Sequence, residues 1–182
     1  MKKAIVFLID GFEEIEAITT IDILRRAEVE TVTVSLDPDL RIKGGHDIVI
    51  EADQMYDDTD FQDADMLILP GGAVASQKMF EHHALHQTLK EAAATDKYIA
   101  AICAATMTLG KTGLVSGKNA TCYPGVEKEL TGANIVTDQV VTDGKIITSR
   151  GPATTIPFAL KLAELLSGKE KAREVAKGML VD

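Results

Sequence analysis

Cys103 stands where an apolar stretch of the chain ends and a run of small residues begins, in the sequence YIAAICAATMTLG. The apolar residues 98–102 predict a buried strand, and residues 104–110 predict the first turns of a helix. Cys103 would then lie at the tight turn between them, with alanines two positions before and two positions after it. Such a strand-to-helix turn presents a nucleophile at the end of a sheet, and the small neighbours let the backbones approach closely.

The expected helix start behind Cys103 bears on the acidity of its thiol. Unpaired N–H groups and the positive end of the helix dipole both favour a thiolate. We therefore expect the pKa of Cys103 to lie below the value of about 8.5 that is ordinary for cysteine. The alternative is an inert cysteine buried in the core, since free cysteines are often buried. The spacing alone leaves both interpretations open.

An acyl or hemithioacetal intermediate on Cys103 would need backbone donors for its oxyanion. The sequence LPGGA places Gly71 and Gly72 just past the end of another apolar strand, and glycine permits close backbone approach. The N–H groups of Gly72 and Ala104 are therefore candidates for an oxyanion hole. The alternative is a simple tight turn.

No histidine follows Cys103, so the Cys-then-His order of papain-like enzymes is absent. The four histidines are His46, His82, His83 and His86.

Carboxylates are the remaining candidates for acid–base work. The segment GFEEIEA, residues 11–17, places Glu13, Glu14 and Glu16 beyond the first predicted strand. A glutamate that stays protonated in a buried, apolar setting would donate a hydrogen bond to a thiolate and could carry protons for a substrate. For Glu13 and Glu14 we expect the alternative, negative charges that complement a helix N-terminus. The histidines of HHALH and the acidic stretch 51–65 are expected to be solvated, and no metal site is predicted.

The elements that must position these residues alternate along the chain. Apolar runs predict strands, and apolar residues at helical spacing predict helices. This alternation predicts a single domain, residues 1–182, with a three-layer α/β/α sandwich and a mostly parallel sheet. Sites in such folds lie beyond the carboxyl ends of the strands. The predicted strands are 3–9, 31–36, 65–69, 98–102, 119–124 and 145–152, the helices are 14–27, 82–94, 104–110, 154–168 and 170–177, and 42–54 is an expected antiparallel excursion.

The composition of the chain excludes several classes of protein. The chain has 182 residues, 46% of them hydrophobic, and a net charge of −9 with both signs mixed along it, which argues against disorder, nucleic-acid binding and binding to anionic membranes. The apolar start, residues 4–9, is too short for a signal peptide. The two cysteines, Cys103 and Cys122, are therefore expected to be thiols in a reducing cytoplasm.

The motifs GFEEIEA, LPGG, AAICAAT and SRGP, in this order, resemble the ThiJ/PfpI superfamily, in the branch of the parkinsonism-associated protein deglycase and its bacterial relatives. The resemblance covers essentially the full chain. It implies a flavodoxin-like fold, a homodimer, Cys103 as nucleophile, Glu16 as its protonated partner, and Gly72 and Ala104 as oxyanion donors. Gly71, Tyr123 and Arg150 are further candidates for substrate binding, and at the turn of Arg150 the resemblance implies anion or dimer contacts.

The activities that the resemblance implies are those of glutathione-independent glyoxalases and deglycases, acting without a cofactor on a reactive aldehyde or a glycated protein. A redox sensor or redox-regulated chaperone built on Cys103 is the second interpretation. A cysteine amidase or peptidase is the third. It is disfavoured because Tyr123 stands where several relatives have a histidine, and a phenol is a poor general base at neutral pH.

Overall fold

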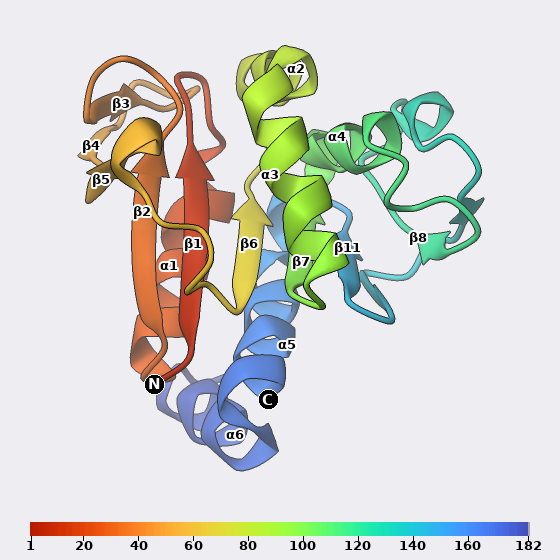
Figure 1. The fold of residues 1–182 in the computed structure, drawn as a ribbon. Coiled ribbons are helices and arrows are strands. Elements are labelled where there is room, and N and C mark those ends of the chain that lie inside the picture. Colours follow the sequence, from red (N-terminus) through yellow and green to blue (C-terminus); the bar gives the residue numbers. More distant parts are fainter. Residues whose placement is uncertain (182) are drawn as a thin grey trace.

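The computed structural model describes residues 1–181 and contains a central sheet with helices on both faces (Figure 1). The strand order is β10-β11-β7-β6-β1-β2-β5, and all neighbouring pairs are parallel except β10 and β11. The parallel strands therefore follow the flavodoxin-like order. Their bounds are β1 Lys3–Leu8, β2 Glu30–Ser35, β5 Gln54–Met55, β6 Met66–Leu69, β7 Tyr98–Ile102, β10 Val140–Asp143 and β11 Ile146–Ser149.

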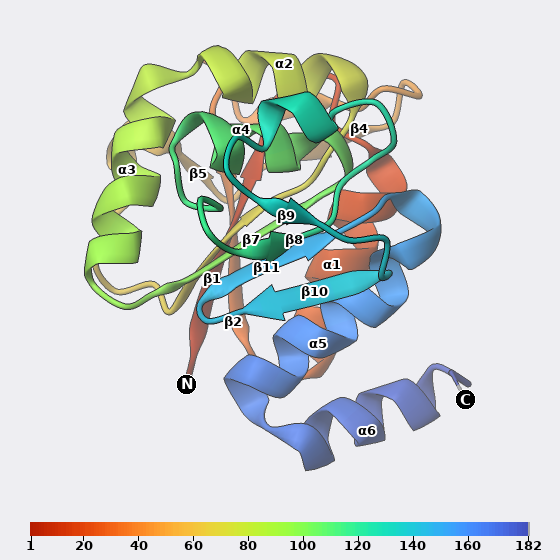
Figure 2. The same cartoon turned by 90° about the vertical axis from the view of Figure 1, so that its right-hand side faces the viewer.

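Six α-helices complete the described chain, and they lie in two layers. Helices α1 and α5 pack together behind one face of the sheet with α6 against α5, while α2, α3 and α4 cover the other face (Figures 1 and 2). The sandwich and its mainly parallel sheet confirm the predicted fold class. The bounds are α1 Glu14–Arg26, α2 Ala73–Glu81, α3 His83–Ala94, α4 Thr106–Lys111, α5 Thr155–Ser167 and α6 Lys169–Gly178.

The apolar runs that predicted the strands are buried because helices cover both faces of the sheet. Every residue of β6 is buried, as are Ala4–Leu8 in β1 and residues 99–102 in β7. These central strands end at the same edge of the sheet, and the predicted site loops follow them there. No helix among residues 1–181 has the length and apolar character that crossing a bilayer requires.

Two small sheets flank the core. Strands β3 (Arg41–Lys43) and β4 (Val49–Glu51) form the antiparallel excursion that the sequence predicts. Strand β8 is limited to Asn119–Ala120, paired with β9 (Asn134–Ile135), so the predicted strand 119–124 is too long. It ends because the next residue turns toward β11, where the Thr121 N–H donates to Thr148 Oγ1 at 2.9 Å.

The prediction of a solvated histidine face on residues 82–86 is wrong for two of the three rings. His82 caps helix α3, since its Nδ1 accepts a hydrogen bond from the Leu85 N–H at 3.0 Å. His86 is buried, and its Nε2 lies 3.1 Å from the Met79 carbonyl oxygen. The preceding helix α2, which the sequence did not predict, supplies that carbonyl and thereby covers His86.

The hairpin β3–β4 is fastened to the loop after β1 at the carboxyl edge of the sheet. The Gly11 N–H donates to the Lys43 carbonyl at 2.7 Å, and the Gly45 N–H donates to the Phe12 carbonyl at 2.8 Å. The Glu13 N–H donates to the Gly71 carbonyl at 2.9 Å, which joins this loop to the glycine turn after β6. The start of β1 and helix α6 lie at the opposite edge (Figure 1).

Candidate active site

Cys103 occupies the tight turn that the sequence predicts between β7 and the following helical segment. It opens a short 3-10 turn, Cys103–Ala105, that leads into α4, and its φ of 63° lies in the left-handed region that residues with a Cβ rarely adopt. The turn is held by Thr106 Oγ1, which donates to the Cys103 carbonyl at 2.8 Å. Strain of this kind persists where the surroundings over-determine it, as they do at functional sites.

Glu16 approaches this turn from the first turn of α1 and is completely buried. Its Oε2 accepts a hydrogen bond from the Gly71 N–H at 2.6 Å. Its Oε1 is buried and finds no partner among residues 1–181. Burial raises the pKa of Glu16 to about 7, although the nearby Cys103 thiol and the hydrogen bond from the Gly71 N–H act in the opposite direction, and the charge of Glu13 raises it further. The carboxyl therefore keeps its proton far above the ordinary range for glutamate.

The expectation of an acidic Cys103 thiol is wrong. Burial, followed by the charge of Glu16, raises the pKa of Cys103 to about 12, although the backbone N–H groups of Ala104 and Gly72 act in the opposite direction. The physical reason is that two acids share one dry site, so the second negative charge is costly. Below about pH 7 the pair therefore holds two protons and no net charge, and above about pH 7 it holds one proton and one negative charge.

Glycines make room for this pair. A Cβ on Gly71 would lie 2.5 Å from Glu16 Oε2 and 2.7 Å from the Cys103 Cβ, so no side chain fits between the two groups. Gly72 has a φ of 106° and is the N-cap of α2, a conformation that glycine adopts without strain. The LPGG turn is thus a packing requirement of the Cys103–Glu16 pair, in addition to a source of backbone donors.

The other predicted substrate contacts lie further out. Tyr123 is 48% exposed, and its ring packs at Gly151, where an added Cβ would be 4.0 Å from the Cys103 sulfur. Arg150 donates to the Thr137 carbonyl at 3.3 Å, and its charge lowers the pKa of Cys122, which burial raises to about 11. Tyr123 thus forms the rim of the site, and Gly151 is a neighbour of the thiol that the sequence indicated only through its SRGP segment.

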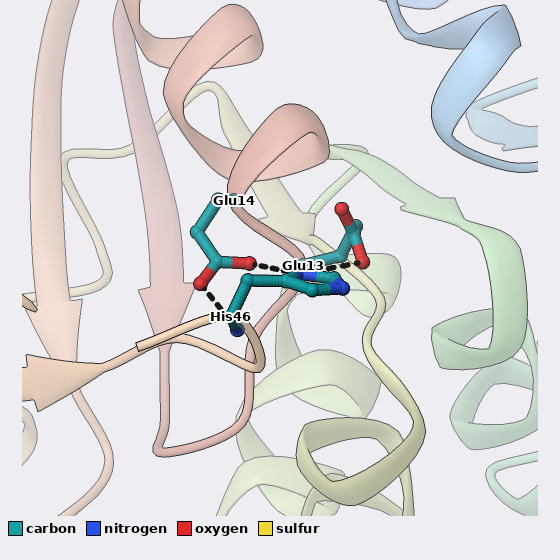
Figure 3. A group of neighbouring side chains, drawn as sticks. All are labelled: Glu13, Glu14 and His46. Atoms are coloured by element: carbon teal, nitrogen blue, oxygen red, sulfur yellow. Dashed lines mark hydrogen bonds and ion pairs between the residues drawn. The ribbon is translucent and has the colours of Figure 1, made fainter. Parts of the chain in front are cut away.

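A second polar group lies beside the pair and was not predicted (Figure 3). Glu14 lies in the first turn of α1, in agreement with the expectation of a charge at a helix N-terminus. It is buried, and both of its oxygens contact His46: Oε1 accepts from the backbone N–H at 2.6 Å, and Oε2 lies 2.8 Å from Nδ1. Burial alone would raise the pKa of Glu14, but the hydrogen bonds from His46 lower it, and the same contact raises the pKa of His46. Glu13 Oε2 lies 3.8 Å from His46 Nδ1.

Comparisons with known proteins give one consistent result. The model of the DJ-1/PfpI family matches residues 2–165. Protein dj-1beta of Drosophila melanogaster is 41% identical over 182 residues, covering 99% of this chain and 97% of that protein. Its crystal structure superposes with a TM-score of 0.95 at 42% identity, covering 100% of this chain and 98% of that one. The glutathione-independent glyoxalase DJ-1 of Schizosaccharomyces pombe is 32% identical, covering 98% of each chain.

Proposed function

The chain belongs to the DJ-1/PfpI family, and on that premise we propose that it is a cofactor-independent cysteine enzyme that converts reactive 2-oxoaldehydes into 2-hydroxy acids. The observation that carries the proposal is the buried Cys103–Glu16 pair, in which a carboxyl with a pKa of about 7 keeps one oxygen unpartnered beside a thiol. The glyoxalase relative from Schizosaccharomyces pombe supports the same reaction class.

The first step is addition of sulfur to the aldehyde. In the singly protonated pair the proton first moves from the Cys103 sulfur to the Glu16 carboxylate. The thiolate then attacks the aldehyde carbon of methylglyoxal, and the oxygen that becomes negative accepts hydrogen bonds from the N–H groups of Gly72 and Ala104. Glu16 then gives its proton to that oxygen, which leaves a hemithioacetal on Cys103 and a carboxylate at residue 16. The charge of the pair is conserved throughout this step.

The second step moves a proton between the two carbons of the substrate. The Glu16 carboxylate removes the proton from the former aldehyde carbon, and an enediolate forms as the electrons shift onto the ketone oxygen. Glu16 returns the proton to the neighbouring carbon while the hydroxyl proton of the former aldehyde carbon moves to the former ketone oxygen, which gives a thioester of the 2-hydroxy acid. Water hydrolyses the thioester, releases lactate and restores the Cys103 thiol. The sum is methylglyoxal plus water giving lactic acid, with no external oxidant or reductant.

The test is methylglyoxal consumption and lactate formation by the whole chain, with glutathione absent and EDTA present. We expect turnover under these conditions. In D₂O we expect deuterium at the hydroxyl-bearing carbon of lactate, because a carboxyl that exchanges with solvent carries the proton. Absence of turnover would contradict the enzyme proposal, and turnover without deuterium would contradict the role of Glu16.

The second candidate is a redox sensor at the same cysteine. The observation in its favour is that the backbone N–H groups of Ala104 and Gly72 act on the Cys103 sulfur and stabilise its negative charge, so they would also hold the oxygens of a sulfinate. Mass spectrometry after mild peroxide treatment separates the two candidates. Oxidation of Cys122 without oxidation of Cys103 would remove the redox interpretation.

An amidase role stays disfavoured, since His46 is engaged by Glu14 and the Cys103 turn faces Tyr123 and Gly151.

We also propose a homodimer. Helix α1 and the adjoining β3–β4 hairpin expose large apolar side chains, namely Ile15, Ile18, Ile48 and Val49. Large apolar side chains left exposed on neighbouring elements suit an interaction surface. Sedimentation velocity should show a dimer, and Ile18→Glu should shift it toward monomer because a charge would be buried. A wild-type monomer at all concentrations would contradict the proposal.

Two free thiols favour a reducing compartment, and we propose the cytoplasm.

A further inference from the structure

Three potential metal ligands meet at the start of helix α1. Glu13 and Glu14 reach toward His46 from the helix, and His46 reaches toward them from the loop of the β3–β4 hairpin (Figure 3). One ligand atom from each residue lies within 4.8 Å of the other two. We propose that Glu13, Glu14 and His46 form a binding site for a divalent transition-metal ion, with Zn²⁺ the ion that the donors fit best. This site goes beyond the proposed function, which needs no metal.

The surroundings of the Glu13 carboxylate favour a role as a metal ligand over a role in an ion pair. Its side chain is only 16% exposed, and neither carboxylate oxygen accepts a hydrogen bond from residues 1–181. Its nearest cationic partner, His46 Nδ1, is 3.8 Å away, which is too long for a hydrogen bond. Neither Glu13 oxygen is completely closed off from solvent, so both can be reached by an ion that approaches from solution. Glu14 needs no further partner, because His46 satisfies both of its oxygens.

The spacing of the donors fits a small ion. Zn²⁺ binds nitrogen and oxygen at about 2.0–2.2 Å in a tetrahedron, which puts neighbouring ligand atoms roughly 3.3 Å apart. The distances from His46 Nδ1 to Glu14 Oε2 and to Glu13 Oε2 are 2.8 Å and 3.8 Å, one shorter and one longer than that edge. Small rotations of the side chains therefore suffice. In the single chain the His46 side chain is 71% exposed, so the fourth position is open to water or to a ligand from a second chain.

The scaffold around the ligands is fixed from both sides. A Cβ on Gly44 would lie 2.5 Å from Glu14 Cδ, so the hairpin backbone packs directly on the carboxyl. The Gly45 N–H bond to Phe12 and the Glu13 N–H bond to Gly71 hold the hairpin and the helix start in register. The helix dipole disfavours a cation at this end, but two full negative charges outweigh its partial charge. An imidazole with two carboxylates favours zinc over calcium and magnesium, which prefer oxygen alone.

Isothermal titration with Zn²⁺ tests the site. Thiols also bind zinc, so the titration is made in the Cys103→Ala protein, where the proposed ligands are intact. We expect one Zn²⁺ per chain there. His46→Ala in that background should weaken the affinity at least about tenfold, since the loss of a ligand costs no less than the loss of a group that supports one. His83→Ala, which removes another exposed imidazole, should leave the affinity unchanged.

Glu13→Gln gives an independent arm, because it removes one negative charge and keeps the shape of the side chain. We expect weaker Zn²⁺ binding with an unchanged circular dichroism spectrum. With Co²⁺ as probe, the visible absorption should indicate nitrogen and oxygen ligands without sulfur. Three results would each overturn the site: no Zn²⁺ binding by the Cys103→Ala protein, equal binding by its His46→Ala form, or equal loss of binding in the His83→Ala control.

Discussion

Replacement of Cys103 by alanine is expected to abolish the conversion of methylglyoxal to lactate, with kcat/KM falling by at least about 10⁴-fold. The covalent route disappears with the sulfur, because no other described side chain takes its place at the turn after β7. Alanine keeps the Cβ, so it meets the same left-handed backbone conformation at a φ of 63° and leaves the turn intact. The measurement is lactate formation by purified wild-type and variant protein, compared at matched protein concentration.

The matched control is Cys122→Ala, which removes the other thiol. Cys122 is 4% exposed, and its charged neighbours are Glu127 and Arg150. We expect its removal to cost core packing and to leave turnover within about twofold, with thermal melts used to verify that both variants are folded. Equal activity of the Cys103 variant and wild type would refute the proposed nucleophile. Equal loss in both variants would point to a shared structural effect instead.

Replacement of Glu16 by glutamine is expected to lower turnover by about 10² to 10⁴-fold, the range for loss of a general acid–base group. Glutamine can still accept the Gly71 N–H bond and fills the same volume, so the Cys103 turn should keep its shape. It cannot carry a proton between the two substrate carbons. Stopped assays should therefore show little lactate, while alkylation of Cys103 by iodoacetamide continues. Unchanged turnover in Glu16→Gln would remove the assigned role.

The same variant tests the acidity of the pair through stability. The native Glu16 pKa of about 7 lies above the unfolded value of 4.5, so the native state holds a proton that the unfolded chain releases in this window. Its contribution is therefore fully present below about pH 4.5 and is lost as the pH rises through about 7. Between about pH 5 and pH 8, wild type should lose roughly 2 to 3 kcal/mol relative to Glu16→Gln.

Urea unfolding at each pH measures this difference. A chelator is kept in the buffer so that no metal ion at the neighbouring Glu13–Glu14–His46 group contributes. The two proteins share every other titrating group, so their difference isolates residue 16. Parallel stability curves across this range would mean that Glu16 titrates in the native state as it does in the unfolded chain, and the buried proton would then have to be abandoned.

The sequence was most informative where one local pattern decided the outcome. The unbroken apolar runs of β1, β6 and β7 specify central strands, because only strands covered on both faces bury every residue. The placement of Cys103 at a turn follows from the same pattern, because the strand that precedes it ends at Ile102. The role assigned to Glu16 came from resemblance to a family, and the structure brings its carboxyl to the thiol without testing the role.

The errors arose where long-range burial decided the outcome. The raised pKa of Cys103 depends on burial and on Glu16, which lies far away in sequence, whereas the local pattern indicated only a helix start. The contact between Glu14 and His46, which was not predicted, depends on a hairpin 32 residues further on. Helix α2 was missed because its start is the left-handed Gly72, which is indistinguishable in sequence from a plain turn.

The positions of the first strand and the last helix determine how the protein can be fused to a partner or tethered to a surface. Chemistry is gathered at the carboxyl edge of the sheet, while β1 starts and α6 lies at the opposite edge (Figure 1). A fluorescent fusion partner or a surface tether joined before Lys3 or after α6 would therefore point away from Cys103. The molecule can be immobilised by either end with its reactive face turned toward the solution.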